Sequence, residues 1–88
     1  MKTLKEVVEV SGEGLESLLG ERVTLFCSAY IYTGTLVGVN STCVKLTKAA
    51  IVYETGSLTT KTWQDAQTLP HDWYVQTSAI ESFGLLKE

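Results

Sequence analysis

The side chains best suited to metal or redox chemistry are Cys27, Cys43 and His71. Thiolate sulfur and imidazole nitrogen are common zinc ligands, but a structural zinc site needs four ligands that converge on one point. These three residues lie far apart in the sequence and form neither a Cys-x-x-Cys nor a His-x-x-x-His pair. We therefore expect no metal site and no cofactor.

His71 and Asp72 are adjacent, and such a pair can take part in acid–base catalysis. No nucleophile in a recognisable catalytic context accompanies them. The Gly-Glu-Gly segment at residues 12–14 does not follow a clear strand within a βαβ unit, so it indicates a turn rather than a phosphate-binding loop. We expect no catalytic residues and no enzymatic activity.

Two short polar segments, residues 40–42 and 76–78, carry amide and hydroxyl groups that can donate and accept hydrogen bonds. A lysine follows the first segment closely and adds positive charge. The candidate binding residues are Asn40, Ser41, Thr42, Lys45, Gln76, Thr77 and Ser78. Polar residues are also common in turns that bind nothing, and that interpretation remains open.

The elements that must position these residues are β-strands. Three runs rich in β-branched and aromatic residues, 23–26, 30–39 and 43–53, are separated by three residues each. Links of that length fit hairpins and are too short for a crossover helix, so an antiparallel meander is expected over residues 20–54. Gly34 and Gly38 lie inside the second run and predict bulges or bends there, and the long third run is expected to bend near Ala49 and Ala50.

The segments that flank the meander are less regular. Residues 5–10 alternate only partly, and residues 15–19 read as a short helix that ends at Gly20, where a left-handed cap is favoured. Residues 55–70 are polar and predict a long loop, with an irregular hairpin around residues 58–63 as an option. Residues 71–86 contain two further strand-like runs, 73–76 and 79–85, joined by a tight link.

Composition narrows the class of protein. The 88 residues are the size of one domain, they contain no run of about 18 apolar residues, and we expect no signal peptide. With two cysteines, a disulfide scaffold is not expected, and we predict a cytoplasmic protein with free thiols and no membrane association. The net charge of −3 argues against a strongly basic, sequence-blind nucleic-acid binder, although residues 23–53 carry Lys45 and Lys48 and no carboxylate.

The last two strands carry Glu81 as their only charge, and an apolar strand with an unpaired edge favours pairing with another chain. If the fourth strand of one copy pairs with the fifth strand of the next, the contact is heterologous and closes into a ring or continues as a filament. We therefore expect a homo-oligomer. Its predicted interface residues are Trp73, Tyr74, Val75, Ile80 and Phe83.

Taken together, the short helix, the bent second strand, the long third strand, the variable loop and the final strand pair resemble the Sm and Sm-like family over residues 15–84. The first family motif is matched by Gly20, Val23, Leu25, Gly34, Leu36 and Leu46, with Asn40 where an Asp is usual. In the second motif, residues 75–80 keep the hydrophobic pattern but lack its Arg-Gly pair. The resemblance implies a mainly β fold: a short N-terminal helix followed by a strongly bent, five-stranded antiparallel small barrel of the SH3-like (Sm-like) type.

The resemblance also implies a ring of about five to seven copies that binds single-stranded RNA or DNA through the loops after the second and fourth strands. In this chain Ser41 takes the place of the stacking aromatic residue and Cys43 that of an Asn, so uracil-specific recognition is not expected.

Two alternatives stay open. The first is a structural or adaptor ring that binds protein, with Trp63 and Trp73 at its contact surface, because the acidic balance does not favour nucleic acid. The second is an unrelated SH3-like or OB-type barrel, which need not form rings. The aromatic residues of the strands could stack on bases, but they fit core or interface packing as well.

Overall fold

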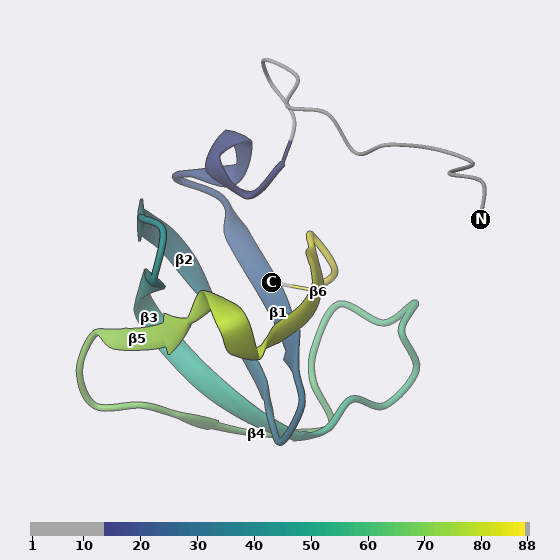
Figure 1. The fold of residues 1–88 in the computed structure, drawn as a ribbon. Coiled ribbons are helices and arrows are strands. Elements are labelled where there is room, and N and C mark those ends of the chain that lie inside the picture. Colours follow the sequence, from purple (N-terminus) through teal and green to yellow (C-terminus); the bar gives the residue numbers. More distant parts are fainter. Residues whose placement is uncertain (1–13, 88) are drawn as a thin grey trace, which may run out of the picture.

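The computed structural model describes residues 14–87, and the partly alternating segment at residues 5–10 lies outside them. A single 3-10 turn, η1 (Leu15–Leu18), precedes the meander β1 (Arg22–Cys27), β2 (Ile31–Val39) and β3 (Cys43–Glu54). The chain continues through β4 (Asp65–Thr68), β5 (Trp73–Gln76), a second 3-10 turn η2 (Thr77–Ala79) and β6 (Ile80–Gly84). The mainly β fold and the antiparallel meander are thus confirmed (Figure 1).

All six strands belong to one antiparallel sheet with the order β4-β3-β2-β1-β6. β5 also pairs with β3: it lies along residues 43–46 of β3, whereas β4 lies along residues 50–54. β4 and β5 are therefore two pieces of one interrupted edge. The expectation of five strands was wrong by one, because β4 occupies part of the segment that we predicted as loop.

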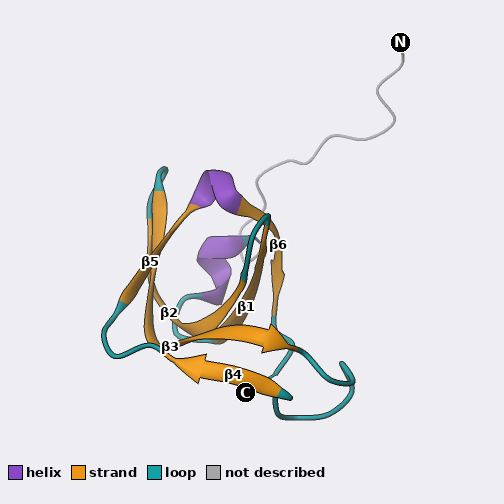
Figure 2. Ribbon diagram, turned by 90° about the horizontal axis from the view of Figure 1, so that it is seen from below, coloured by secondary structure: helices purple, strands orange, loops and turns teal. Residues whose placement is uncertain are grey.

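The short connection between its two edges shows that the sheet is curled. From β5 to β6 a flat sheet would span four strand spacings, roughly 19 Å. η2, with three residues of 3-10 helix, rises only about 2 Å per residue. Figure 2 shows the result: the sheet bends round so that η2 links β5 to β6 across one end.

Two irregularities in the β2–β3 ladder produce this bend. The register shifts between Thr33 and Thr35, where β3 contributes an extra residue, and again between Leu36 and Gly38. Opposite the first shift, Lys48 has a left-handed backbone with a φ of 51°, and its carbonyl oxygen accepts a 2.9 Å hydrogen bond from the Arg22 guanidinium. The predicted bends in the second and third strands are confirmed at these positions.

The core fills the concave side of the sheet. Six of its members are completely buried aliphatic side chains of β1, β2 and β3, and β5 contributes the seventh residue. The core residues are Val23, Leu25, Leu36, Val44, Leu46, Ala49 and Val75. Burial of a side chain of this size stabilises the fold by about 1.5 to 3 kcal/mol, so a core this small leaves little reserve.

The turns at the start of the chain differ in part from expectation. The predicted helix over residues 15–19 is one 3-10 turn, too short to bury any residue completely. Gly20 has the left-handed backbone expected of it, with a φ of 89°. Its amide donates a 2.7 Å hydrogen bond to the Leu36 carbonyl oxygen and so fixes the entry into β1.

The bend at Gly34 can be tested by adding one methyl group. A Cβ at Gly34 would lie 3.1 Å from the Ala49 Cα and 3.1 Å from the Leu46 Cβ, closer than ordinary contact. We expect Gly34→Ala to lower the free energy of unfolding by about 1 to 3 kcal/mol, measured by urea denaturation.

Gly38→Ala is the matched control for that measurement. Its Cβ would meet only the Lys45 Cβ, at 3.5 Å, so we expect stability to stay unchanged or to rise by up to about 1 kcal/mol. Equal stability of the two variants would contradict the close approach described at Gly34.

Candidate binding loops and free strand edges

The fold brings the two polar segments of the sequence together. Residues 40–42 form the turn between β2 and β3, and residues 76–78 form the link from β5 into η2. The Thr77 amide donates a 2.9 Å hydrogen bond to the Thr42 carbonyl oxygen, and the Thr77 hydroxyl donates a 3.0 Å bond to the Ser41 carbonyl oxygen. We call residues 40–42 and 76–78 the paired polar loops.

Asn40 holds the first of these loops in shape. Its Oδ1 accepts hydrogen bonds from the Thr42 amide at 2.8 Å, the Thr42 hydroxyl at 3.0 Å and the Cys43 amide at 2.9 Å. This is the Asx-turn arrangement, in which the side chain replaces a backbone acceptor. The acceptor of Asn40 is therefore occupied internally, while the exposed side chains of Ser41, Gln76 and Ser78 remain at the surface.

Lys45, the predicted source of positive charge, faces away from the core on β3. Its ammonium lies 3.7 Å from the Asp72 carboxylate and 5.6 Å from the centre of the Tyr74 ring. Contact with the Tyr74 phenol and then attraction to Asp72 raise the pKa of Lys45. The lysine stays protonated at neutral pH, but Asp72 balances its charge locally.

The predicted interface residues occupy the free edges of the sheet, and they differ in burial. Trp73 lies opposite Leu46 and Phe83 lies opposite Leu25, so both face the core side, yet they remain 39% and 42% exposed. β5 and β6 are not paired with each other, and we call this break in strand pairing, with Trp73 on one side strand and Phe83 on the other, the open seam. Tyr74 faces outward and is 60% exposed.

The other two predicted interface residues contribute less surface. Val75 is 5% exposed and belongs to the core cluster, so only its backbone is available at the edge of β5. Ile80 is half-buried and packs against that cluster. Strand alternation directs the Val75 side chain inward between Tyr74 and Gln76, so the predicted contact of Val75 with another chain would have to be made by its backbone.

Several aromatic side chains make contacts within the chain. Tyr30 and Tyr32 pack edge to face, with ring centres 6.3 Å apart. Trp63 is half-buried, and the Lys87 ammonium lies 4.8 Å from its ring centre. Trp63 therefore does not present the exposed contact surface that the protein-binding alternative assigned to it.

The cysteines are free thiols, and residues 14–87 contain no group of three metal-ligating side chains. Burial, together with the nearby Glu81 carboxylate, raises the pKa of Cys27. Cys43 begins β3 opposite Gln76, beside the paired polar loops. Within the same part of the chain no helix is long and apolar enough to cross a membrane.

The structural roles of two charged residues, Asp72 and Lys87, were not identified from the sequence. Asp72 was considered only with its neighbour His71, although its contact is Lys45, twenty-seven positions away. Lys87 is 5% exposed, and its ammonium donates hydrogen bonds to acceptors in the loop between β3 and β4. The only local signal for Lys87 is its position after the apolar pair Leu85 and Leu86, which does not indicate where the ammonium goes.

The structural role of Asn40 generates a prediction. Asn40→Ala removes the acceptor of three hydrogen bonds, and we expect it to lower the free energy of unfolding by about 1 to 2 kcal/mol in urea denaturation. Asn40→Asp keeps an acceptor at the same place and should retain most of the stability. Ser41→Ala removes an exposed hydroxyl and should change little. A neutral Asn40→Ala variant would mean that the loop does not depend on this side chain.

The described surface thus offers two features on which a function can be built: the paired polar loops, and the free edges of β5 and β6 with the open seam between them. No family model, curated protein or solved structure matches this chain.

Proposed function

We propose that this chain is a non-catalytic, Sm-like small-barrel protein that assembles into a homo-oligomeric ring and binds single-stranded nucleic acid through the paired polar loops. The observation that carries the proposal is the pairing of those loops. Hydrogen bonds from Thr77 join the β2–β3 turn to the β5–η2 link, so that small donors and acceptors from two distant segments share one surface.

Assembly follows from the free edges. β5 pairs only with β3 and β6 only with β1, so each has one side whose backbone groups lack a strand partner within residues 14–87. Exposed Trp73, Tyr74 and Phe83 lie on these strands. A β5 edge that pairs with the β6 edge of the next copy satisfies the backbone groups and covers the open seam. Because the two surfaces differ, the contact is heterologous. We propose that it closes into a ring of about five to seven copies, the assembly that the Sm-like resemblance implies, rather than continuing as a filament.

Ring formation compensates for a weak single site. The paired polar loops offer hydroxyl and amide groups but no stacking aromatic, and Asp72 balances the charge of Lys45. A single copy should therefore bind nucleic acid feebly. Several copies around one axis bind a strand together, because every contact after the first is intramolecular. Hydroxyl and amide contacts of this kind go mainly to phosphate and sugar, which suits both RNA and DNA.

A carboxylate at the β5 edge should block assembly. Tyr74 is 60% exposed, so Tyr74→Glu should fold while replacing an exposed aromatic side chain of the edge strand by a carboxylate, and charged side chains at a strand edge oppose pairing with another chain. We expect the unmodified protein to sediment as a closed oligomer and the variant to sediment as a monomer or at a markedly smaller mass.

Tyr53→Glu is the matched control, since Tyr53 is a 53% exposed aromatic residue of β3 that lies on neither β5 nor β6. It should leave the oligomer intact. A monomeric unmodified protein, or an assembly lost equally in both variants, would count against edge pairing.

Nucleic-acid binding can be tested through the charge of Lys45. Asp72→Asn frees the Lys45 ammonium from its carboxylate partner, so we expect affinity for single-stranded RNA or DNA to rise by about three- to tenfold at low salt. Lys45→Gln should weaken binding by a similar factor. The measurement is fluorescence anisotropy with labelled oligonucleotides of 20 or more nucleotides.

Asp65→Asn is the control for Asp72→Asn. Asp65 is exposed on β4, which pairs with the half of β3 remote from the paired polar loops. This variant loses the same charge and should bind like the unmodified protein. Equal gains in the two variants would indicate a general charge effect, and no binding by any of them up to high micromolar concentration would refute the proposal.

The second candidate function is an adaptor ring that binds a protein partner. The Lys45–Asp72 ion pair favours it, because this pair leaves the surface beside the paired polar loops without a net positive charge. Exposed Trp73 and Tyr74 would then be contact residues, as aromatic side chains are at protein interfaces. Affinity capture separates the two functions by whether nucleic acid or polypeptide is retained by the oligomer.

A further inference from the structure

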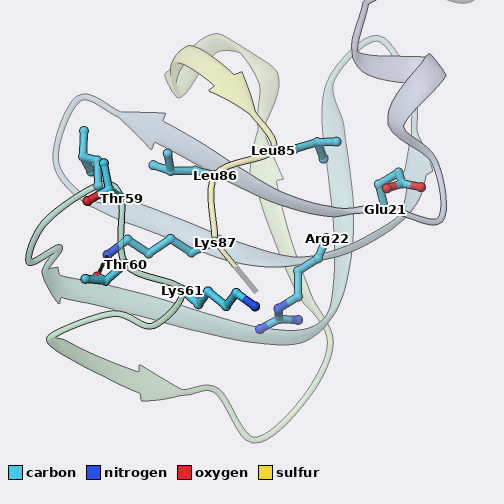
Figure 3. A pocket seen from close by; sticks show the side chains of 9 residues that line it. Glu21, Arg22, Thr59, Thr60, Lys61, Leu85, Leu86 and Lys87 are labelled. Carbon is cyan, nitrogen blue, oxygen red and sulfur yellow. Dashed lines mark hydrogen bonds between the residues drawn. The ribbon is translucent and has the colours of Figure 1, made fainter.

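A pocket lies on another part of the molecule, away from the paired polar loops. It has a volume of about 360 Å³ and is lined by Glu21 and Arg22 at the start of β1, by residues 58–61 of the loop between β3 and β4, and by residues 85–87 after β6 (Figure 3). That volume lies at the lower end of the range of small-molecule sites. None of its lining residues has a part in the proposed nucleic-acid surface.

The wall formed by the loop is held in place by Lys87. Its ammonium donates to the carbonyl oxygens of Thr55 at 2.6 Å, Ser57 at 2.8 Å and Thr62 at 2.9 Å. It also donates to the Thr60 hydroxyl at 3.2 Å. These contacts take up the three protons of the ammonium, so Lys87 fixes the loop against the residues after β6 and leaves little hydrogen-bonding capacity for a ligand.

Two other cations at the pocket keep hydrogen-bonding capacity among the described residues. Arg22 donates from Nη1 to the Lys48 carbonyl oxygen, which orients the guanidinium, and its other N–H groups make no further hydrogen bond within residues 14–87. In Figure 3 the Lys61 side chain extends toward the Arg22 guanidinium. Within residues 14–87 neither cation has a carboxylate at salt-bridge distance, since the ion pair found there joins Lys45 and Asp72. Two positive head groups therefore lie at one pocket with Glu21 as the one acidic residue of its lining.

The rest of the pocket surface is apolar. Leu58, Leu85 and Leu86 are 54%, 56% and 36% exposed, and all three line the same pocket. The pocket is therefore amphipathic, because exposed leucines and two cations line the same concave surface. Its apolar and charged parts suit different ends of one ligand.

We propose that this pocket binds a small organic anion with an aliphatic body, either a carboxylate or a phosphate monoester. Arg22 and Lys61 bind the anionic head group, the guanidinium by paired N–H donors and the ammonium as a point charge. Leu58, Leu85 and Leu86 cover the aliphatic part. Lys87 acts as a positioning residue that keeps the wall of the site in place.

The test is a two-dimensional NMR titration of the full chain with four probes: octanoate, octyl phosphate, acetate and octyltrimethylammonium. We expect octanoate and octyl phosphate to bind with a Kd of roughly millimolar or tighter, the range open to ligands of about ten heavy atoms. Shifts should be centred on residues 21–22, 58–61 and 85–87. Acetate lacks the aliphatic body and octyltrimethylammonium has the wrong charge, so both should bind at least about tenfold more weakly.

Variants separate the roles of the residues. Arg22→Gln combined with Lys61→Met should weaken octanoate and octyl phosphate by about tenfold or more. Lys45→Gln also removes a positive charge, at a residue that does not line this pocket, so binding of both octyl anions should be unchanged. Folding of each variant is checked from the dispersion of the same spectra.

Absence of shifts with both octyl anions would overturn the proposal, as would equal binding of octyltrimethylammonium. A double variant that folds and still binds octanoate normally would also overturn it. Preference for octyl phosphate over octanoate, or the reverse, identifies the head group and supports the site in either case. Because the pocket lies apart from the paired polar loops, a failure here leaves the proposed nucleic-acid function untouched.

Discussion

The close approach of β2 to β3 at Gly34 is the constraint on which the rest of the structure depends. Because Gly34 has no side chain, the backbone of β3 can pass close to β2 at this point. Here β3 contains one extra residue, and Lys48 has a left-handed backbone conformation. The sheet curls from that point, and only a curled sheet lets the three residues of η2 connect β5 to β6. Enclosure of the small core, contact between the paired polar loops and formation of the open seam all follow from this curl.

The same curl leaves two large aromatic side chains on the core side partly exposed. It brings the two edges near each other without pairing them, so Trp73 and Phe83 face the core side but keep about two fifths of their surface exposed. A second copy can cover the open seam by a β5–β6 pairing, which links assembly directly to the fold. Assembly would also set several pairs of polar loops around one axis, so binding strength would come from repetition rather than from a charged groove.

The sequence predicted those features of the fold that depend on residues close together in the chain. Glycines inside a β-branched run indicated the bends in β2, three-residue links indicated hairpins, and the strand boundaries of the meander followed from composition. β4 was missed because Asp65, Ala66 and Gln67 have low strand propensity, and this exposed segment is a strand because it pairs with the far half of β3.

The contacts of the Lys45 and Lys87 ammonium groups could not be predicted from the sequence for a related reason. Lys45 pairs with Asp72 and Lys87 with the loop after β3, each across more than twenty positions, and nothing in the local sequence records such pairing. Asn40 was assigned to ligand binding, whereas its side-chain oxygen closes a turn. Of the candidate site, the sequence could therefore identify which loops meet but not which side chains stay available within them.

The central claim is that the free edges of β5 and β6 are paired between copies. Amide hydrogen exchange over residues 73–76 and 80–84 tests this claim most directly. The account predicts that the outward-facing amides of these strands are protected at high protein concentration and lose that protection on dilution, while β2 stays protected throughout. Rapid exchange of the same amides at every concentration would contradict it.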